Sequence, residues 1–178
     1  MKMYKKITNR LYLIGFMGCG KSTVSKILGE LCSLPCVEMD EEISKRAGMP
    51  IPEIFETCGE SHFRDLESAL IAEIAEGGPC VVSCGGGAVL RRENVSCMKN
   101  SGTIVYLTAA PETIYERVKE DTNRPLLNGH MEICHIVGLM EARRDAYENA
   151  ADVCVATDGR TPADIAREIA GITGRGGL

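Results

Sequence analysis

The sequence contains no tryptophan, and aromatic residues of all kinds make up only 4% of its 178 residues. A hydrophobic core must therefore be built from aliphatic side chains, which are plentiful because the AVILMFWYC set reaches 44%. A chain of this length and composition is predicted to form one domain that folds without disulfides or a structural metal. Disordered, collagen-like and coiled-coil proteins are excluded.

Long runs of like charge are also missing. The net charge is −5, and no run of like charge is longer than the acidic residues 40–42. The sequence therefore offers no basic face for nucleic acid, and an anionic ligand must be held by a local cluster of cations. The apolar segment near the start is interrupted at Gly15 and followed by polar residues. This segment therefore predicts neither secretion nor a membrane span. A cytoplasmic monomer that makes no membrane contact is our further expectation.

The nine cysteines lack the spacing of a metal site. No pair has the C-x-x-C pattern, and there are only three histidines, which argues against a zinc site. Most of the cysteines lie in apolar segments. We therefore expect them to be small buried hydrophobic residues in a reducing compartment.

Short aliphatic segments alternate with segments of helical period. The predicted strands are residues 11–14, 36–39, 80–83, 103–107 and 152–156, and the predicted helices are 21–32, 41–47, 62–75, 111–120, 131–150 and 162–172. This alternation predicts an α/β fold in which helices cover a parallel sheet. Residues 49–64 and 121–129 fit it poorly, and we expect them to form a substrate-binding insertion and a mobile lid.

One glycine-rich segment carries a specific motif. Residues 15–23 read GFMGCGKST, which satisfies G-x-x-x-x-G-K-[ST] directly after a predicted strand and before a predicted helix. In such a loop, backbone N–H groups and the helix N-terminus surround phosphate oxygens, Lys21 reaches the β- and γ-phosphates, and Ser22 binds Mg²⁺. The sequence therefore predicts a nucleoside triphosphate site, with a ligand-free glycine-rich turn as the alternative.

Signals of two other nucleotide-binding classes are absent. No N-K-x-D segment is present to read a guanine base, and the third predicted strand ends in Ser83 and Cys84 rather than in the acidic residue typical of an ATPase motor. Three glycines, residues 85–87, follow instead. Because glycines let a ligand approach the backbone closely, we interpret them as part of a site for a second substrate, with a flexible turn as the alternative.

Together these motifs resemble the shikimate kinase family. Besides the phosphate loop, the matching residues are Asp40, Phe63, Arg64, Glu67, Gly85, Gly86, Gly87, Arg124, Arg143 and Tyr147. The resemblance implies a nucleoside-monophosphate-kinase-like fold with five parallel strands in the order 2-3-1-4-5. It implies phosphoryl transfer from ATP to the 3-hydroxyl of shikimate, a step of aromatic amino-acid biosynthesis. It also implies a single domain, residues 1–178, with a substrate-binding segment at about 38–65 and the lid at about 121–131.

The resemblance further implies residue roles. The expected catalytic residues are Lys21, Asp40 and Arg124. The expected nucleotide contacts are Gly18, Cys19, Gly20, Lys21, Ser22, Thr23, Arg117 and Arg124. The expected shikimate contacts are Asp40, Arg64, Gly85, Gly86, Gly87 and Arg143. Mg²⁺ is expected on Ser22 and, through water, on Glu38, which stands where the family usually has aspartate.

These residue types suit the implied chemistry. Paired arginines can hold the shikimate carboxylate with their planar guanidinium groups. Asp40 would bind ring hydroxyls and accept the proton of the attacking one, Arg117 would stack on adenine, and Arg124 would reach the transferring phosphoryl group. Two alternatives stay open: another small-metabolite kinase of the same fold, such as a gluconate kinase, and a regulatory domain that binds nucleotide without catalysis.

Overall fold

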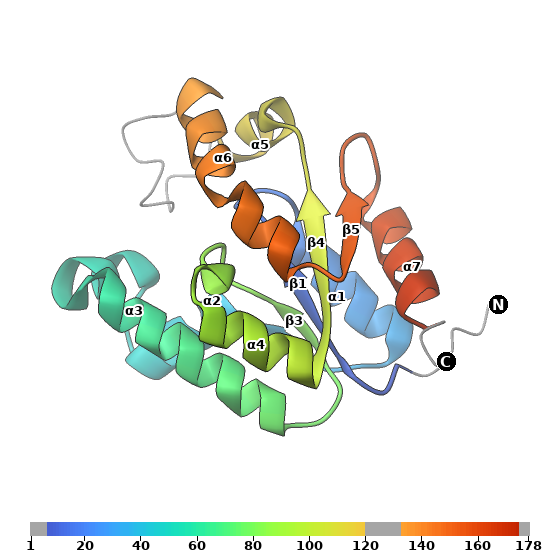
Figure 1. Cartoon of the computed structure of the whole chain (residues 1–178), viewed down its shortest axis with the longest axis horizontal. Coiled ribbons are helices and arrows are strands. Elements are labelled where there is room, and N and C mark those ends of the chain that lie inside the picture. Colours follow the sequence, from blue (N-terminus) through green and yellow to red (C-terminus); the bar gives the residue numbers. More distant parts are fainter. Residues whose placement is uncertain (1–6, 120–132, 175–178) are drawn as a thin grey trace.

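A computed structural model describes residues 7–119 and 133–174 of the chain. Its centre is a sheet of five parallel strands in the order β2-β3-β1-β4-β5 (Figure 1). The strands are β1 (Arg10–Ile14), β2 (Cys36–Glu38), β3 (Val81–Ser83), β4 (Gly102–Thr108) and β5 (Val153–Ala156). The predicted fold class and strand order are confirmed.

Helices cover both faces of the sheet. In the described residues they are α1 (Lys21–Cys32), α2 (Met39–Ala47), α3 (Ile51–Glu76), α4 (Arg92–Ser101), α5 (Pro111–Val118), α6 (Ile133–Ala150) and α7 (Pro162–Thr173), with a 3₁₀ turn, η1 (Ala88–Leu90). Helices α1 and α7 lie on one face, and α2, α3 and α4 lie on the other (Figure 1). Within residues 7–119 and 133–174, no helix is long and apolar enough to cross a bilayer.

Alternate residues of the central strand enter two separate hydrophobic clusters. Leu11 and Leu13 pack with α1 and α7, whereas Tyr12 and Ile14 pack with α2, α3 and α4, and all four are at most 1% exposed. Neighbouring side chains of a strand point to opposite faces, so a strand buried on both sides is apolar at most of its positions. This explains why the inner strands are recognisable as unbroken aliphatic segments.

The sequence prediction missed helix α4. Only Asn94 and Met98 of its ten residues are buried, so its apolar stripe is too narrow to produce a clear helical period. Tertiary contacts support the helix instead. Asn94 Nδ2 donates to the carbonyl of Ala88 at 3.0 Å, which ties α4 to η1.

The predicted insertion is more helical than its prolines suggest. Helix α3 already begins at Ile51, because Pro50 precedes it and Pro52 lies in its first turn, where a helix does not need the missing N–H. A break at Gly59, where φ is 83° and ψ is 165°, separates residues 51–58 from the rest of α3. The other predicted segment, residues 121–129, lies outside the described residues.

The prediction that most cysteines are buried is wrong. Cys19, Cys80 and Cys84 are buried and Cys32 and Cys97 are partly buried, but the other four are exposed: Cys36, Cys58, Cys134 and Cys154. Two of the exposed thiols lie in β2 and β5, which are the edge strands of the sheet. A residue of an edge strand can therefore be exposed even when the residues next to it in the sequence are apolar.

Arg10 joins the central strand to the ends of two helices. Its guanidinium donates to the backbone carbonyls of Ile74 at 2.7 Å, of Ser101 at 3.1 Å, and of Gly77. These carbonyls lie at the C-terminal ends of α3 and α4, where backbone acceptors lack helical partners and the helix dipole favours a cation. One side chain therefore holds both helices against the start of β1.

We expect Arg10→Met to lower the free energy of unfolding by about 2 kcal/mol, because three carbonyls lose a charged donor. The corresponding fall in Tm is roughly 4–8 °C for a chain of this size, measured by circular dichroism. Arg10→Lys should recover part of the loss, since an ammonium keeps the charge but not the fork. The control is Arg92→Met, which removes an exposed arginine from α4. An equal loss in both methionine variants would contradict the role of Arg10.

Candidate active site

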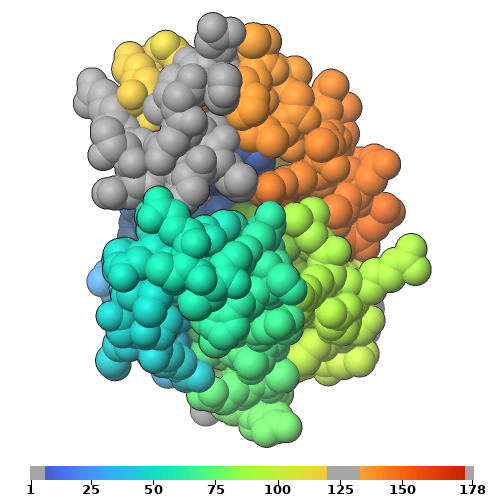
Figure 2. Space-filling model, turned by 90° about the vertical axis from the view of Figure 1, so that its left-hand side faces the viewer, coloured from blue at the N-terminus to red at the C-terminus, as the bar shows by residue number. Residues whose placement is uncertain are grey.

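The carboxyl ends of the strands open into a cavity of about 860 Å³. Because the strands are parallel, the segments that follow β1, β2 and β3 all begin at this edge, and they line the cavity together with residues of α3, α5 and α6. In Figure 2, blue atoms from the N-terminal part of the chain are visible between teal α3 and orange α6. The fold thus brings residues from most of the sequence around one cavity.

The segment between β1 and α1 is built as a phosphate-binding loop. Gly18 has a φ of 78°, and a Cβ atom there would lie 2.6 Å from Val118, so this position requires glycine. Helix α1 begins directly afterwards at Lys21, which directs the positive end of its dipole toward the loop. Five of the six expected loop contacts line the cavity: Gly18, Gly20, Lys21, Ser22 and Thr23.

Lys21 turns back over the loop. Its ammonium donates to the carbonyl of Gly15 at 2.8 Å and to that of Phe16 at 3.1 Å. The Cys19 side chain, by contrast, is 1% exposed and packs in the core beneath the loop, while its N–H donates to Phe16 O at 3.2 Å. The loop therefore presents a cation to the cavity and keeps the thiol inside.

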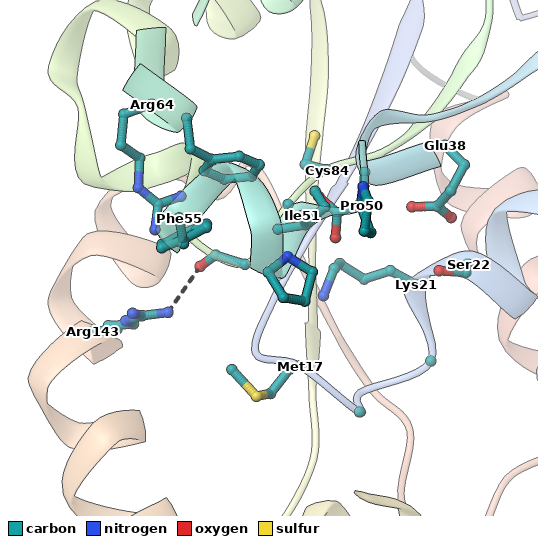
Figure 3. A pocket seen from close by; sticks show the side chains of 18 of the residues that line it. Met17, Lys21, Ser22, Glu38, Pro50, Ile51, Phe55, Arg64, Cys84 and Arg143 are labelled. Atoms are coloured by element: carbon teal, nitrogen blue, oxygen red, sulfur yellow. Dashed lines mark hydrogen bonds between the residues drawn. The ribbon is translucent and has the colours of Figure 1, made fainter. Parts of the chain in front are cut away.

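Glu38 lies beside this loop, at the end of β2 (Figure 3). Burial raises the pKa of its carboxyl, the hydroxyls of Ser22 and Ser83 act against that shift, Asp40 adds to it, and Lys21 opposes it. Glu38 Oε2 is buried without a hydrogen-bond partner among the described residues. A buried, unpaired carboxylate oxygen next to a phosphate loop fits Mg²⁺, which needs few protein ligands because water and phosphate supply the rest.

Two of the three glycines after β3 make room for charged side chains. A Cβ atom on Gly85 would lie 2.4 Å from Glu67 Oε1 and 3.1 Å from Asp40 Oδ1. A Cβ atom on Gly87 would lie 2.2 Å from Arg64 Nη1. No side chain fits at either position without displacing these groups, so the glycine run serves close packing against charged groups.

Arg64 is fixed by two carboxylates of its own helix. Its Nη1 donates to Glu67 Oε2 at 2.9 Å and its Nη2 donates to Glu60 Oε1 at 3.0 Å. Arg64 is 8% exposed and Glu67 is fully buried. Burial raises the pKa of the Glu67 carboxyl, and the neighbouring guanidinium opposes the shift. The arginine is thereby held at the wall of the cavity in one orientation.

Arg143 reaches the same cavity from helix α6. Its Nη1 donates to the carbonyl of Gly86 at 3.5 Å, and the Tyr147 hydroxyl donates to the same oxygen. Arg143 and Arg64 lie on the side of the cavity opposite Lys21 (Figure 3). The cavity therefore has a phosphate-loop end and a second end that carries two arginines.

Arg117 connects two loops at the phosphate-loop end. Its Nη1 donates to the carbonyl of Gly18 and to Thr157 Oγ1, both at 3.2 Å. Helix α5, which carries Arg117, is itself attached to the segment after β5, because Asp158 Oδ1 accepts from the N–H of Ala110 at 2.9 Å. The fold therefore places the guanidinium beside the phosphate loop through contacts between distant parts of the chain: Arg117 and Gly18 are 99 residues apart, and Asp158 and Ala110 are 48 apart.

The sequence analysis included the apolar wall of the cavity in its expected substrate-binding segment but assigned no role to its side chains. Pro50, Ile51, Pro52, Phe55 and Phe63 all line it. The proline-rich composition of residues 49–64 indicated a special segment but did not show which side chains face inward. Arg124, the remaining expected catalytic residue, lies outside the described residues.

Comparison with known proteins identifies close relatives. Residues 17–172 match the model of the family described as shikimate kinase. A shikimate kinase of Persephonella marina is 43% identical over 161 residues, which cover 90% of this chain and 96% of that protein. The structure of a shikimate kinase from Acinetobacter baumannii in complex with shikimate has a TM-score of 0.89 and 32% identity, covering 94% of this chain and 93% of that one.

A gluconokinase from Sinorhizobium meliloti shares the fold. Its TM-score is 0.62 at 21% identity, and the match covers 96% of this chain and 93% of that one. Identity at this level supports the architecture alone.

We expect Glu38→Gln to change how stability depends on pH. The ordinary pKa of this group is 4.5, and burial raises it in the folded protein. Such a group contributes stability that is complete below its ordinary pKa and is lost as the pH rises through the raised value. The Tm of Glu38→Gln relative to the parent should therefore increase from acidic to neutral pH. Glu41→Gln, which removes an exposed carboxylate from α2, is the control for the loss of charge; the same trend in both variants would contradict the prediction.

Proposed function

The chain belongs to the shikimate kinase family and phosphorylates shikimate with ATP, a step of aromatic amino-acid biosynthesis; we propose which of its residues do this. The observation that carries the proposal is a single cavity with a phosphate-binding loop at one end and two arginines, Arg64 and Arg143, at the other. The carboxylate of an acceptor can bind to these two arginines, whereas a neutral polyol offers them no charge.

The phosphate-loop end binds ATP. Backbone N–H groups of the loop and the start of α1 hold the phosphates, and Lys21 stabilises the charge that develops on the γ-phosphoryl oxygens. Arg117, fixed between Gly18 and Thr157, offers a flat cation to the adenine ring. Ser22 and Glu38 would hold Mg²⁺, with Glu38 acting through water. When bound, the ion neutralises charge on the β- and γ-phosphate oxygens.

The opposite end binds shikimate. Arg143 and Arg64 pair with its carboxylate, and the backbone of the glycine run lies against the substrate. Asp40 is exposed in the first turn of α2, lines the cavity and adjoins Gly85. We assign it the proton of the attacking 3-hydroxyl. The role of Arg124, the substrate-binding segment at 38–65, the monomeric state and the cytoplasmic location stay predictions.

Lys21→Ala should lower kcat at least ~100-fold, about 2.7 kcal/mol, because the variant loses charge stabilisation in the transition state. The measurement is ADP release coupled to a spectrophotometric assay. Lys26→Ala is the matched control, since this lysine lies on the same helix with a side chain that is 60% exposed. Turnover near that of the parent in Lys21→Ala would mean that the phosphate loop is assigned wrongly.

Arg143→Ala should raise the KM for shikimate roughly 10- to 150-fold, the equivalent of about 1.5–3 kcal/mol for a charged hydrogen bond, and leave the KM for ATP unchanged. Arg143→Lys should recover part of the loss, because an ammonium cannot bond both carboxylate oxygens as a fork.

Arg144→Ala is the control for this prediction, because Arg144 is the next residue on α6 and pairs with Glu141 on the exposed surface. The same assay with gluconate as acceptor tests the substrate class. Efficient phosphorylation of gluconate without that of shikimate would overturn the assignment, as would unchanged shikimate kinetics in Arg143→Ala.

A further inference from the structure

Tyr147 is a buried residue at the second end of the cavity. It lies on α6 one turn after Arg143, and it is 1% exposed. Its hydroxyl donates to the carbonyl of Gly86, the same oxygen to which Arg143 Nη1 donates at 3.5 Å. The two side chains therefore meet at one acceptor, which has two lone pairs.

The carbonyl of Gly86 is therefore a shared hydrogen-bond acceptor for two side chains of α6. It accepts from the Tyr147 hydroxyl and, at 3.5 Å, from Arg143 Nη1. Gly86 is also close to the phosphate loop, since a Cβ atom on it would lie 3.8 Å from Tyr147 Oη and 3.9 Å from both Gly15 O and Met17 N. The hydroxyl thus fixes the glycine run between α6 and the phosphate loop.

The ring of Tyr147 is itself immobilised. It stacks on Tyr106 with ring centroids 5.0 Å apart and an interplanar angle of 14°. Tyr106 belongs to β4 and is the register partner of Ile14, the last residue of β1 before the phosphate loop. Burial raises the pKa of Tyr147 to about 12, with Arg143 acting against the shift, so the hydroxyl stays protonated and able to donate at neutral pH.

We propose that Tyr147 is a positioning residue for the acceptor substrate: its hydroxyl fixes the Gly86 carbonyl and the Arg143 guanidinium in the orientation that binds the shikimate carboxylate. The proposal rests on the proposed function of Arg143. The phenol reaches the substrate only through its two partners, so it acts on acceptor binding and not on the phosphoryl group.

The test is Tyr147→Phe, which removes one oxygen and keeps the ring stacked on Tyr106. We expect the KM for shikimate to rise about three- to tenfold, the range for loss of a single hydrogen bond. We expect kcat and the KM for ATP to stay within about twofold, because the phosphate-loop end is unchanged. Tyr106→Phe is the matched control: it removes an oxygen from the other ring of the same stack, and its shikimate KM should equal that of the parent.

A double-mutant cycle separates positioning from general stability. If Tyr147 acts through Arg143, adding Tyr147→Phe to Arg143→Ala should raise the shikimate KM by less than twofold, because the group to be positioned is gone. Calorimetric binding of shikimate to all four proteins of the cycle gives an independent measurement. A purely structural role predicts instead that Tm falls and that kcat and both KM values change together.

The outcomes distinguish the two proposals. If Arg143→Ala raises the shikimate KM but Tyr147→Phe does not, or if the two effects multiply fully, the positioning role is wrong and the proposed function stands. If Arg143→Ala itself leaves shikimate binding unchanged, the proposed function of Arg143 fails and the positioning role fails with it.

Discussion

The second end of the cavity, which carries the two arginines, depends on one constraint. Charged side chains lie very close to the run of three glycines that follows β3. Arg64 Nη1 occupies the space where a Cβ atom of residue 87 would lie, and Glu67 does the same at residue 85. Any side chain at these positions would push the charged groups away from the cavity wall. The glycines therefore fix the position of the arginine as much as its own helix does.

Burying these charges is costly, and the arrangement limits the cost. An isolated buried charge is strongly unfavourable, and removing one partner of a buried pair typically costs about 3–5 kcal/mol. Arg64 keeps two carboxylates within 3.0 Å, one buried and one at the surface. Its orientation is thus set in the folded protein, and the carboxylate ligand that we propose would cost less side-chain entropy when it binds.

The two ends of the cavity differed in how far the sequence predicted them. The phosphate loop and the positions of the strands depend on local features, namely glycines at fixed spacing and aliphatic strands, and these were predicted, whereas the strand order came from the resemblance to the shikimate kinase family. The second end depends on contacts between distant segments: Arg64 with the glycine run, and Tyr147 with Gly86. Helix α4 was missed because it also depends on tertiary contacts: only Asn94 and Met98 of its residues are buried, which is too few for a clear helical period. The exposed cysteines show that an edge strand cannot be told from an inner strand by its composition.

The difference between the two ends of the cavity also explains why the fold alone does not define the acceptor substrate. The gluconokinase with a TM-score of 0.62 shares the architecture at 21% identity, so a parallel sheet that presents a phosphate loop is compatible with different substrates. Discrimination must come from side chains that the sheet does not dictate. In our proposal those are the arginines of α3 and α6; Arg64 packs against Gly87, and Arg143 donates to the carbonyl of Gly86. Because the backbone of Gly86 also adjoins Gly15 O and Met17 N, the end of the cavity with the two arginines is built directly on the phosphate loop, and in our proposal this one short segment would set the distance between the two substrates.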